Sequence, residues 1–559
     1  MSFESVQQWV EAMTVHAVIG PVLARDIAVT WAGLQVALIG VAIIIFVSST
    51  EDAVLDLSYW ILMLGAPLTI WRRPSSAKIR ALEERQVAII VPAWQESGVI
   101  GQMLHNTVKS MEYKRYHVFV GVYPNDPKTR DEVETLSAAF PNIHCVIVDN
   151  PGPTKKSDCL NQVVRNILKY EAGSGEQFDI FVNHDAEDVV HPFELKLVNW
   201  YTRTNGMVQI PVFSLDRNPR ALVACHYMDE FAEWHTKDLV IRSALTGMTP
   251  SAGVGTAFSR AAIDALLKAR NNEIFNPNSL TEDYDIAQFL FHLGFKSQFI
   301  RYRARMPYKL ATTFRKRVVL RYRREMVATR EYFPDRFRAA IRQKARWMQG
   351  ICFQGWRQIG WQGRTIDRYF LWRDRKQLLT APAVILAYLI FFMAAALLIA
   401  PHIWRGFPVL PPLIERDWVW TLIYINLGYL VNRLLHRALF VWTAHGLRFV
   451  LLSPVRAVVG NFIGFFAFAR ALRQYIFSGL TGRSVAWDKT THAFPVLALN
   501  AALVRVAGPH QAHAFSAGVR PRVGPREARD LRLLQELRTN ARFVPPETSG
   551  LNPAGTKAP

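Results

Sequence analysis

Cysteine is scarce in this sequence. The 559 residues include four cysteines, at positions 145, 159, 225 and 352. No two of them form a CxxC pair, so the chain lacks the pattern of a zinc knuckle or of a secreted disulfide framework. A reducing, cytosolic location suits the region that carries them.

Glycine-rich nucleotide-binding motifs are missing as well. Acidic residues are fewer than basic ones. No GxGxxG follows a predicted strand, which disfavours a dinucleotide site, and the lack of GxxxxGK[ST] excludes a P-loop nucleotidase. Lys and Arg number 66 against 45 Asp and Glu, for a formal net charge of +21. No RNA- or DNA-binding motif accompanies that charge, so we predict no nucleic-acid partner.

Long uncharged apolar runs are present, and they indicate a membrane. Residues 27–50 and 378–400 carry no charge, and each run reaches the roughly 20 apolar residues that cross a bilayer. Residues 57–71 are either a span or a buried helix, and residues 449–469 are either a span or an interfacial helix. Residues 418–431 are a further candidate, which makes four or five spans in all.

The charge distribution predicts the orientation of these spans. Arg72 and Arg73 follow the second apolar run, and residues 301–347 hold sixteen Lys or Arg against three Asp or Glu. Because basic residues stay on the cytoplasmic side, the centre of the chain is expected there. We favour helices on an anionic leaflet for the basic stretch, rather than an ordinary solvated face. The connector 401–417 is expected outside.

The region between residues 80 and 350 alternates apolar runs with helical patterns, which predicts an α/β domain with a mostly parallel sheet. Ligands bind beyond the carboxyl ends of the strands in such sheets, and polar residues gather at these positions. The expected strands are 87–93, 116–124, 144–149 and 178–185, and the expected helices are 97–110, capped by Ser97, 129–139 and 156–170.

Three motifs in this region could carry chemistry. Asp185 and Glu187 leave the fourth strand at i and i+2, where two carboxylates can hold a hard cation such as Mg²⁺ or Mn²⁺. A solvated loop is the alternative. Residues 281–285 (TEDYD) open a helix, which is also an ordinary helix start. Residues 343–347 (QKARW) end the basic stretch and alone would be helix surface.

Taken in order, these motifs resemble a family 2 glycosyltransferase with transmembrane segments, over residues 87–347. The order is PAWQE, an aspartate after the second strand, a Lys/Asn segment, DAE, TED and QKARW. A closer similarity is to the phage-adsorption protein B group, and it continues to about residue 492. That similarity lies in VGVYPNDP, SAGVGTAFSR, SLTEDYDIA, YFLWRDRK and AWDKTTH.

The resemblance implies a GT-A fold inserted between α-helical transmembrane segments, a nucleotide-sugar donor (a UDP-sugar) and Mg²⁺ or Mn²⁺. It assigns Asp185 and Glu187 to the metal and diphosphate, and Asp283 to the catalytic base. The remaining positions would bind substrate: Pro92, Glu96, Asp126, Lys156 and Asp158 toward the donor, Glu282 beside the base, and Gln343, Arg346 and Trp347 as the acceptor-side wall.

The chain is expected to be a multi-pass protein of the bacterial inner membrane. Its expected organisation has five parts. Residues 1–77 hold one or two spans, 78–350 the cytoplasmic transferase domain, 351–377 an interfacial segment, 378–480 further spans, and 481–559 a partly disordered tail. Relatives carry a regulatory domain after the spans. Residues 501–559, with one expected helix at 526–538, depart from that pattern.

The leading interpretation is an inverting glycosyltransferase that extends a surface polysaccharide or other glycan acceptor. It would work among membrane lipids, with an outer-membrane export partner. Two alternatives stay open. One is the transfer of a single sugar to a lipid-linked acceptor, and the other is a non-catalytic scaffold or receptor component that has kept the transferase fold.

Overall fold

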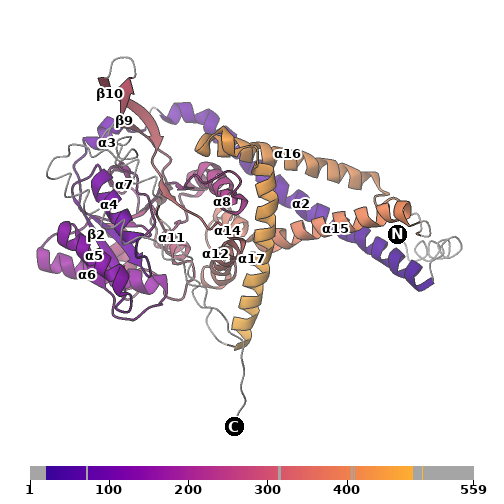
Figure 1. Cartoon of the computed structure of the whole chain (residues 1–559), viewed down its shortest axis with the longest axis horizontal. Coiled ribbons are helices and arrows are strands. Elements are labelled where there is room, and N and C mark those ends of the chain that lie inside the picture. The colour runs from indigo at the N-terminus through magenta and orange to yellow at the C-terminus, as the bar shows by residue number, and fades with distance from the viewer. Residues whose placement is uncertain are drawn as a thin grey trace, which may run out of the picture.

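The fold is given by a computed structural model, which describes residues 21–70, 73–312, 317–404, 407, 410–481 and 494. It has a rounded domain built on a sheet and a group of long helices that extends from it (Figure 1). The expected helix at 526–538 and the AWDKTTH stretch lie outside the described residues.

A seven-stranded sheet forms the centre of the domain, in the order β3-β2-β1-β4-β7-β5-β8. Strands β1 to β4 pair in parallel, β7 runs antiparallel to both its neighbours, and β5 pairs in parallel with β8. The predicted mostly parallel sheet is therefore confirmed. The strands are β1 Val87–Ala93, β2 Tyr116–Val122, β3 Ile143–Ile147, β4 Ile180–Asn183, β5 Met207–Gln209, β7 Thr256–Ser259 and β8 Ser297–Phe299.

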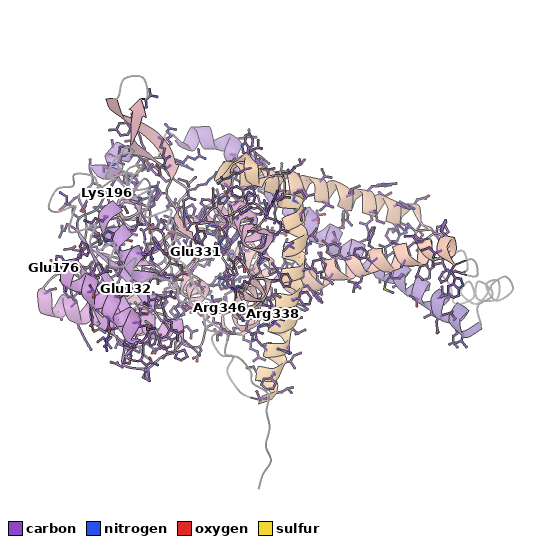
Figure 2. The ribbon with its side chains drawn as sticks, viewed as in Figure 1. Glu132, Glu176, Lys196, Glu331, Arg338 and Arg346 are labelled. Carbon is purple, nitrogen blue, oxygen red and sulfur yellow. The ribbon has the colours of Figure 1, made fainter. Side chains whose placement is uncertain are left out.

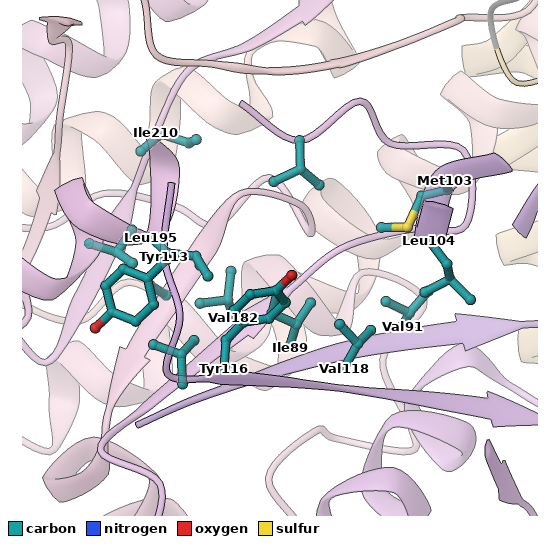
Figure 3. Close-up of a cluster of buried hydrophobic side chains, with 14 of the residues drawn as sticks. Ile89, Val91, Met103, Leu104, Tyr113, Tyr116, Val118, Val182, Leu195 and Ile210 are labelled. Atoms are coloured by element: carbon teal, nitrogen blue, oxygen red, sulfur yellow. The ribbon is translucent and has the colours of Figure 1, made fainter. Parts of the chain in front are cut away.

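Both faces of the sheet are buried, which is why its strands consist of apolar runs. Ile89 and Val91 of β1 point to one face, where they join a cluster with Met103 and Leu104 of α4 (Ile100–Ser110) (Figure 3). Alternate residues of the same strand join a second cluster with α6 (Lys156–Ser174) on the opposite face. The period of two in a strand thus fills two separate cores.

Two of the three predicted helices start at other residues than predicted, whereas α6 starts at Lys156 as predicted. Helix α4 begins at Ile100 and its N-cap is Val99, which makes no side-chain cap, so the predicted Ser97 cap is wrong. Helix α5 (Pro127–Ala139) begins two residues early, because the Asp126 carboxylate caps it. Proline at the first position fits that start, since its missing N–H would have no helical partner there.

Residues 303–331 of the basic stretch are mostly extended, so the prediction of helices is wrong there, whereas the end of the stretch is helical. The extended part forms an antiparallel hairpin, β9 (Arg303–Thr312) with β10 (Arg317–Met326). The short strand β11 (Thr329–Glu331) then pairs with β6 (Val212–Ser214). The sequence of β9 alternates charged and apolar residues, which is the pattern of a strand. Arg303 and Arg305 are exposed, whereas Ala304 and Met306 are buried.

Four long helices lie on one side of the domain (Figure 1). The two N-terminal apolar runs lie in one continuous helix, α2 (Pro21–Ile70), and the others are α15 (Gln377–Ile403), α16 (Asp417–His445) and α17 (Ser453–Thr481). Among the described residues, three helical segments are long and apolar enough to cross a membrane, in α2, α15 and α17. Helices α2, α15 and α16 extend away from the domain together, whereas α17 runs across them (Figure 1).

A charged cluster ties the extended helices to the domain. Arg373 of α14 (Thr365–Arg375) lies 2.6 Å from Glu51 and 2.7 Å from Asp52 of α2, and 2.9 Å from Asp238. Asp56, one turn further along α2, lies 2.6 Å from the Lys237 ammonium. Because each buried charge has an opposite partner, breaking one pair would leave an uncompensated charge. The position of α2 against the domain is therefore strongly specified.

Candidate active site

The predicted metal-binding pair lies where β4 ends, at the carboxyl edge of the parallel strands. The carboxylate of Asp185 lies 2.5 Å from the ammonium of Lys156, the first residue of α6. Burial lowers the pKa of Lys156, but the charges of Asp185, Glu282 and Asp283 outweigh it, and the pKa lies above its ordinary value. The structure therefore brings the DAE and TED motifs to one lysine.

The acids of the TEDYD motif separate into two kinds at the start of α11 (Glu282–His292). Burial, aided by the charge of Asp283, raises the pKa of Glu282 to about 7. Burial also raises the pKa of Asp283 above its ordinary range, against the opposing effect of Lys156 and Arg346. Asp285 instead forms an ion pair with Arg270 at 2.6 Å and has no place in the site.

The QKARW residues lie in α12 (Phe337–Met348), directly beside the TED loop. The Gln343 Oε1 and Arg346 Nε atoms are buried and have no hydrogen-bond partner among the described residues. The charge of Arg346 acts on both Glu282 and Asp283, and the Trp347 ring meets Tyr227 edge-on at 6.1 Å.

A π-helical turn, η2 (Gln349–Gln354), directly follows α12 and contacts the loop that carries the TED motif. The backbone N–H of Leu280 donates to the Gln354 side chain at 2.9 Å. A methyl group on Gly350 would lie 2.3 Å from the Thr281 hydroxyl. Such single π-turns are frequent at functional sites, and here the turn allows close contact between the two motifs.

The predicted donor-side residues lie around the loops after β1 and β2. The Asp126 carboxylate accepts from the Gln95 backbone at 2.5 Å, and it holds Gln95 at a left-handed φ of 54°. Asp158 accepts from Gln162 at 3.2 Å. Pro92 lies inside β1, and the backbone N–H of the buried Glu96 donates to Thr129 at 3.0 Å. Pro92 and Glu96 thus lie at the end of β1 and in the loop that follows it, which Asp126 contacts through Gln95.

Sequence reasoning missed two acids of this site, Asp188 and Glu331. Burial and the charges of Asp188, Glu187 and Asp185 hold the pKa of Glu331 well above its usual range. Asp188 accepts from the backbone N–H of Asp185 at 3.0 Å and from the buried His184 at 2.8 Å. Asp188 could have been predicted, because it is the last acid of the HDAED motif. Nothing local marks Glu331, which reaches the site because Arg330 bridges to Val189, directly after the HDAED motif, and because β11 pairs with β6.

The glycine-rich stretch SAGVG also lies next to the site, beside Asp283. Gly253 has a φ of +83°, and a methyl group on it would lie 3.0 Å from a carboxylate oxygen of Asp283. A side chain at this position would therefore be strained and would also press on the predicted base.

The carboxylates at the β4 exit suit a hard divalent cation. Asp185 and Glu187 offer oxygen ligands, and burial, together with repulsion from Asp188, Glu187 and Asp185, raises the pKa of the nearby Glu331. A Mg²⁺ or Mn²⁺ ion would relieve that repulsion. No three acidic, His or Cys side chains among the described residues are already placed as a full ligand set. Mg²⁺ commonly takes one or two carboxylates together with substrate phosphates and water.

Replacing Gly350 by Ala should lower both turnover and stability. The added methyl would push Thr281 and the acids that follow it, and displacing a reacting group by about 1 Å can cost on the order of 10²-fold in rate. We expect at least a roughly tenfold fall in turnover, with overpacking costing about 1–3 kcal/mol of stability. Gly173→Ala is the matched control, since nothing lies within 4 Å of that position. Unchanged turnover in Gly350→Ala would contradict the contact.

Comparison with known proteins agrees with this geometry. Residues 85–350 match the model of the family described as Glycosyltransferase like family 2. Bacteriophage adsorption protein B of Escherichia coli K12 is 42% identical over 477 residues, which cover 84% of this chain and 64% of that protein. Bacteriophage N4 adsorption protein B of Escherichia coli O157:H7 gives the same values. The chain spans a little under two thirds of the length of these relatives.

Two solved structures were also found to be similar. The mannosyltransferase PcManGT from Pyrobaculum calidifontis, in complex with GDP-Man and Mn²⁺, is 16% identical with a TM-score of 0.46, covering 78% of this chain and 99% of that one. Residues 1–349 of TarS from S. aureus, with UDP-GlcNAc, are 11% identical with a TM-score of 0.29, covering 73% and 97%. At these scores the assignment rests on the sequence matches.

Residues 85–350 are a glycosyltransferase family 2 domain, with the GT-A fold that the motifs predicted. The predicted similarity to the phage-adsorption protein B group is confirmed over 84% of the chain.

Proposed function

We propose that this chain is a membrane-bound, inverting glycosyltransferase that moves a sugar from a nucleotide-sugar to a growing surface glycan. The observation that carries the proposal is the convergence on Lys156. The metal-binding candidate Asp185 and the base candidate Asp283 both act on this one ammonium. Donor phosphates and an acceptor hydroxyl would thus meet on opposite sides of one sugar.

The residues divide the reaction between them. The acceptor oxygen attacks the anomeric carbon while the bond from that carbon to the diphosphate breaks, and the bonding electrons leave with the diphosphate. Asp283 accepts the proton of the attacking hydroxyl. Lys156 stabilises the charge on the departing diphosphate. A cation held by Asp185 and Glu187 would add Lewis-acid stabilisation of the same charge. A single displacement of this kind inverts the anomeric centre.

The acceptor side is assigned to α12. Gln343, Arg346 and Trp347 line the approach to Asp283, and the buried atoms Gln343 Oε1 and Arg346 Nε await a polar partner. A buried polar atom without a partner costs free energy, so an acceptor sugar that supplies hydrogen bonds is favoured there. Asp126 and Asp158 would face the nucleotide of the donor, for which the resemblance implies a UDP-sugar.

Purified protein in detergent provides the test. It should release nucleoside diphosphate from one member of a panel of UDP- and GDP-sugars in the presence of Mg²⁺ or Mn²⁺. Retention of the sugar on an added glycan would support polymer extension, and retention on an added polyprenyl phosphate would support the single-transfer alternative. Release from none of the donors, by protein that binds UDP, would favour the scaffold alternative and overturn the proposal.

We propose that the protein lies in the inner membrane, with its catalytic domain in the cytoplasm and the connector 401–417 on the outer side. A cysteine at Ala138, exposed on α5, should be protected from impermeant thiol reagents in intact cells, and one at Glu415 should be labelled. Ala138 is preferred to the adjacent Ser137, whose hydroxyl donates to Ile143. The reverse labelling pattern would overturn the orientation, which rests on the excess of basic residues near the domain.

A further inference from the structure

Helix α17 has an apolar sequence, but its two faces are used differently. Its buried residues include Ser453, Arg456, Ile463, Ala467 and Ala471. The opposite face exposes large apolar side chains in two groups, one in each half of the helix, and both groups fall on one helical stripe. These are Val455, Val458, Phe462, Phe466, Ile476, Phe477 and Leu480.

The buried face packs against helices of the catalytic domain. The Arg456 guanidinium, fully buried, donates to both carboxylate oxygens of Asp229 in α8 (Leu222–Glu233) at 2.9 Å each. One turn later, Gly460 lets α17 approach His226, whose ring would lie 3.0 Å from an added methyl group. The first half of α17 is therefore fastened to a helix of the domain.

The second half lies on the acceptor-side helix. Ala467 and Ala471 pack in one cluster with Ala345 and Met348 of α12, and Phe466 meets Phe337 at 6.0 Å. Lys344, which directly precedes Ala345 in α12, forms an ion pair with Glu230 of α8 at 2.6 Å. Charged helices of this kind do not lie in hydrocarbon. A helix that follows them for its whole length cannot cross the bilayer there.

The orientation of α17 agrees with this packing. Helices α2, α15 and α16 extend away from the domain, and α17 runs across their near end, along the side of the domain (Figure 1). Where it crosses α15, the Asn461 side chain donates to the Tyr388 hydroxyl at 2.8 Å, and Phe462 stacks on the same ring at 5.8 Å. The exposed apolar stripe thus adjoins the apolar surface of a membrane-spanning candidate.

Basic residues border the stripe. Arg338 and Arg342 of α12 are exposed, and Arg338 lies beside α17 (Figure 2). The exposed Arg473 of α17 falls within the stripe itself, seven residues after Phe466. An apolar face flanked by arginines is the pattern of a helix that lies in the headgroup region of an anionic leaflet.

We propose that α17 does not cross the membrane but lies in the plane of the leaflet next to the catalytic domain, with its exposed stripe among lipid acyl chains. Lipid is the occupant that the stripe fits, because its surface is continuous with that of α15 and is bordered by arginines. The same contact fixes α12, and with it Arg346 and Trp347, at the membrane surface. The inference concerns α17 itself and holds whether or not the proposed transferase activity is correct.

Depth measurements on the full chain test the proposal. Single cysteines at Val458, Phe466 and Phe477, all exposed, are spin-labelled in a Cys145→Ser background, since the other three native cysteines are buried. The protein is reconstituted in phosphatidylcholine–phosphatidylglycerol vesicles. Depth is then read from the relative accessibility to oxygen and to a water-soluble nickel chelate. Labels at Leu379, Leu389 and Ile399 of α15 are the matched control.

The two orientations give different profiles. A helix in the leaflet plane places all three α17 labels at one shallow depth, while the α15 labels show a maximum at Leu389. A depth maximum at Phe466, matching that of α15, would show that α17 is a span and would overturn the proposal. Labels shielded from both reagents would mean that protein, such as a second copy of the chain, covers the stripe, and would overturn it as well.

Discussion

Replacing Asp283 by Asn is expected to lower turnover by about 10²–10⁴-fold, the usual contribution of a positioned general base. Asn keeps the shape of the side chain and can still accept from the Tyr284 backbone N–H, as Asp283 does at 2.8 Å. It cannot take a proton from the acceptor hydroxyl. Donor KM should change little, because Asp126 and Lys156 hold the nucleotide end. Steady-state kinetics with a fixed acceptor measures both.

The neighbouring acid provides a matched control. Asp285 forms an ion pair with Arg270 and accepts from Asn276 at 3.2 Å, so Asp285→Asn should lower thermal stability and spare most of the turnover. If Asp283→Asn kept more than about a tenth of wild-type turnover, the assignment of the base would be wrong, since a base contributes more than that. Melting temperatures of both variants show whether the fold is intact.

The pH profile gives a second measure of the same base. Burial raises the pKa of both Asp283 and Glu282, the latter to about 7. The two acids titrate as a pair. Because the protonated carboxyl cannot accept a proton, kcat/KM should fall with decreasing pH at a higher pH than an ordinary aspartate would give. The acid limb should change in Asp283→Asn and persist in Asp285→Asn.

Removing divalent cations is expected to abolish turnover, and adding Mg²⁺ or Mn²⁺ should restore it. Asp185→Ala should have the same effect without unfolding the protein. The ammonium of Lys156 loses its 2.5 Å partner but still lies in the field of Glu282 and Asp283. Binding of Mn²⁺ in the presence of UDP, followed by electron paramagnetic resonance, should weaken in Asp185→Ala.

An exposed carboxylate elsewhere controls for general loss of negative charge. Asp131 lies on the surface of α5, and Asp131→Ala should bind Mn²⁺ as the wild type does. Full turnover in excess chelator would rule out the metal assignment. Unchanged Mn²⁺ binding in Asp185→Ala would place the ion elsewhere, with the missed Glu331 and its acidic neighbours the next candidates.

Local patterns in the sequence were enough to predict the sheet and part of the site. The bounds of β1 were predicted to the residue, because an uninterrupted run of apolar, mostly β-branched residues is typical of a strand buried on both faces. Asp185 and Glu187 were placed at a strand exit, and TED at a helix start, since both follow from neighbours within a few positions. Uncharged length likewise predicted the apolar helices.

Contacts between distant segments were decided by the tertiary structure alone. Glu331 meets the DAE motif because β11 pairs with β6, and Gly350 meets Thr281 because a π-turn follows α12. The ion pair of Arg456 with Asp229 holds α17 against the domain, where it runs across α2, α15 and α16. The physical reason is that composition and periodicity report how much of a segment is buried and on which face. Which segment covers that face depends on packing over the whole chain, and so does the assembly of the site from residues far apart in sequence.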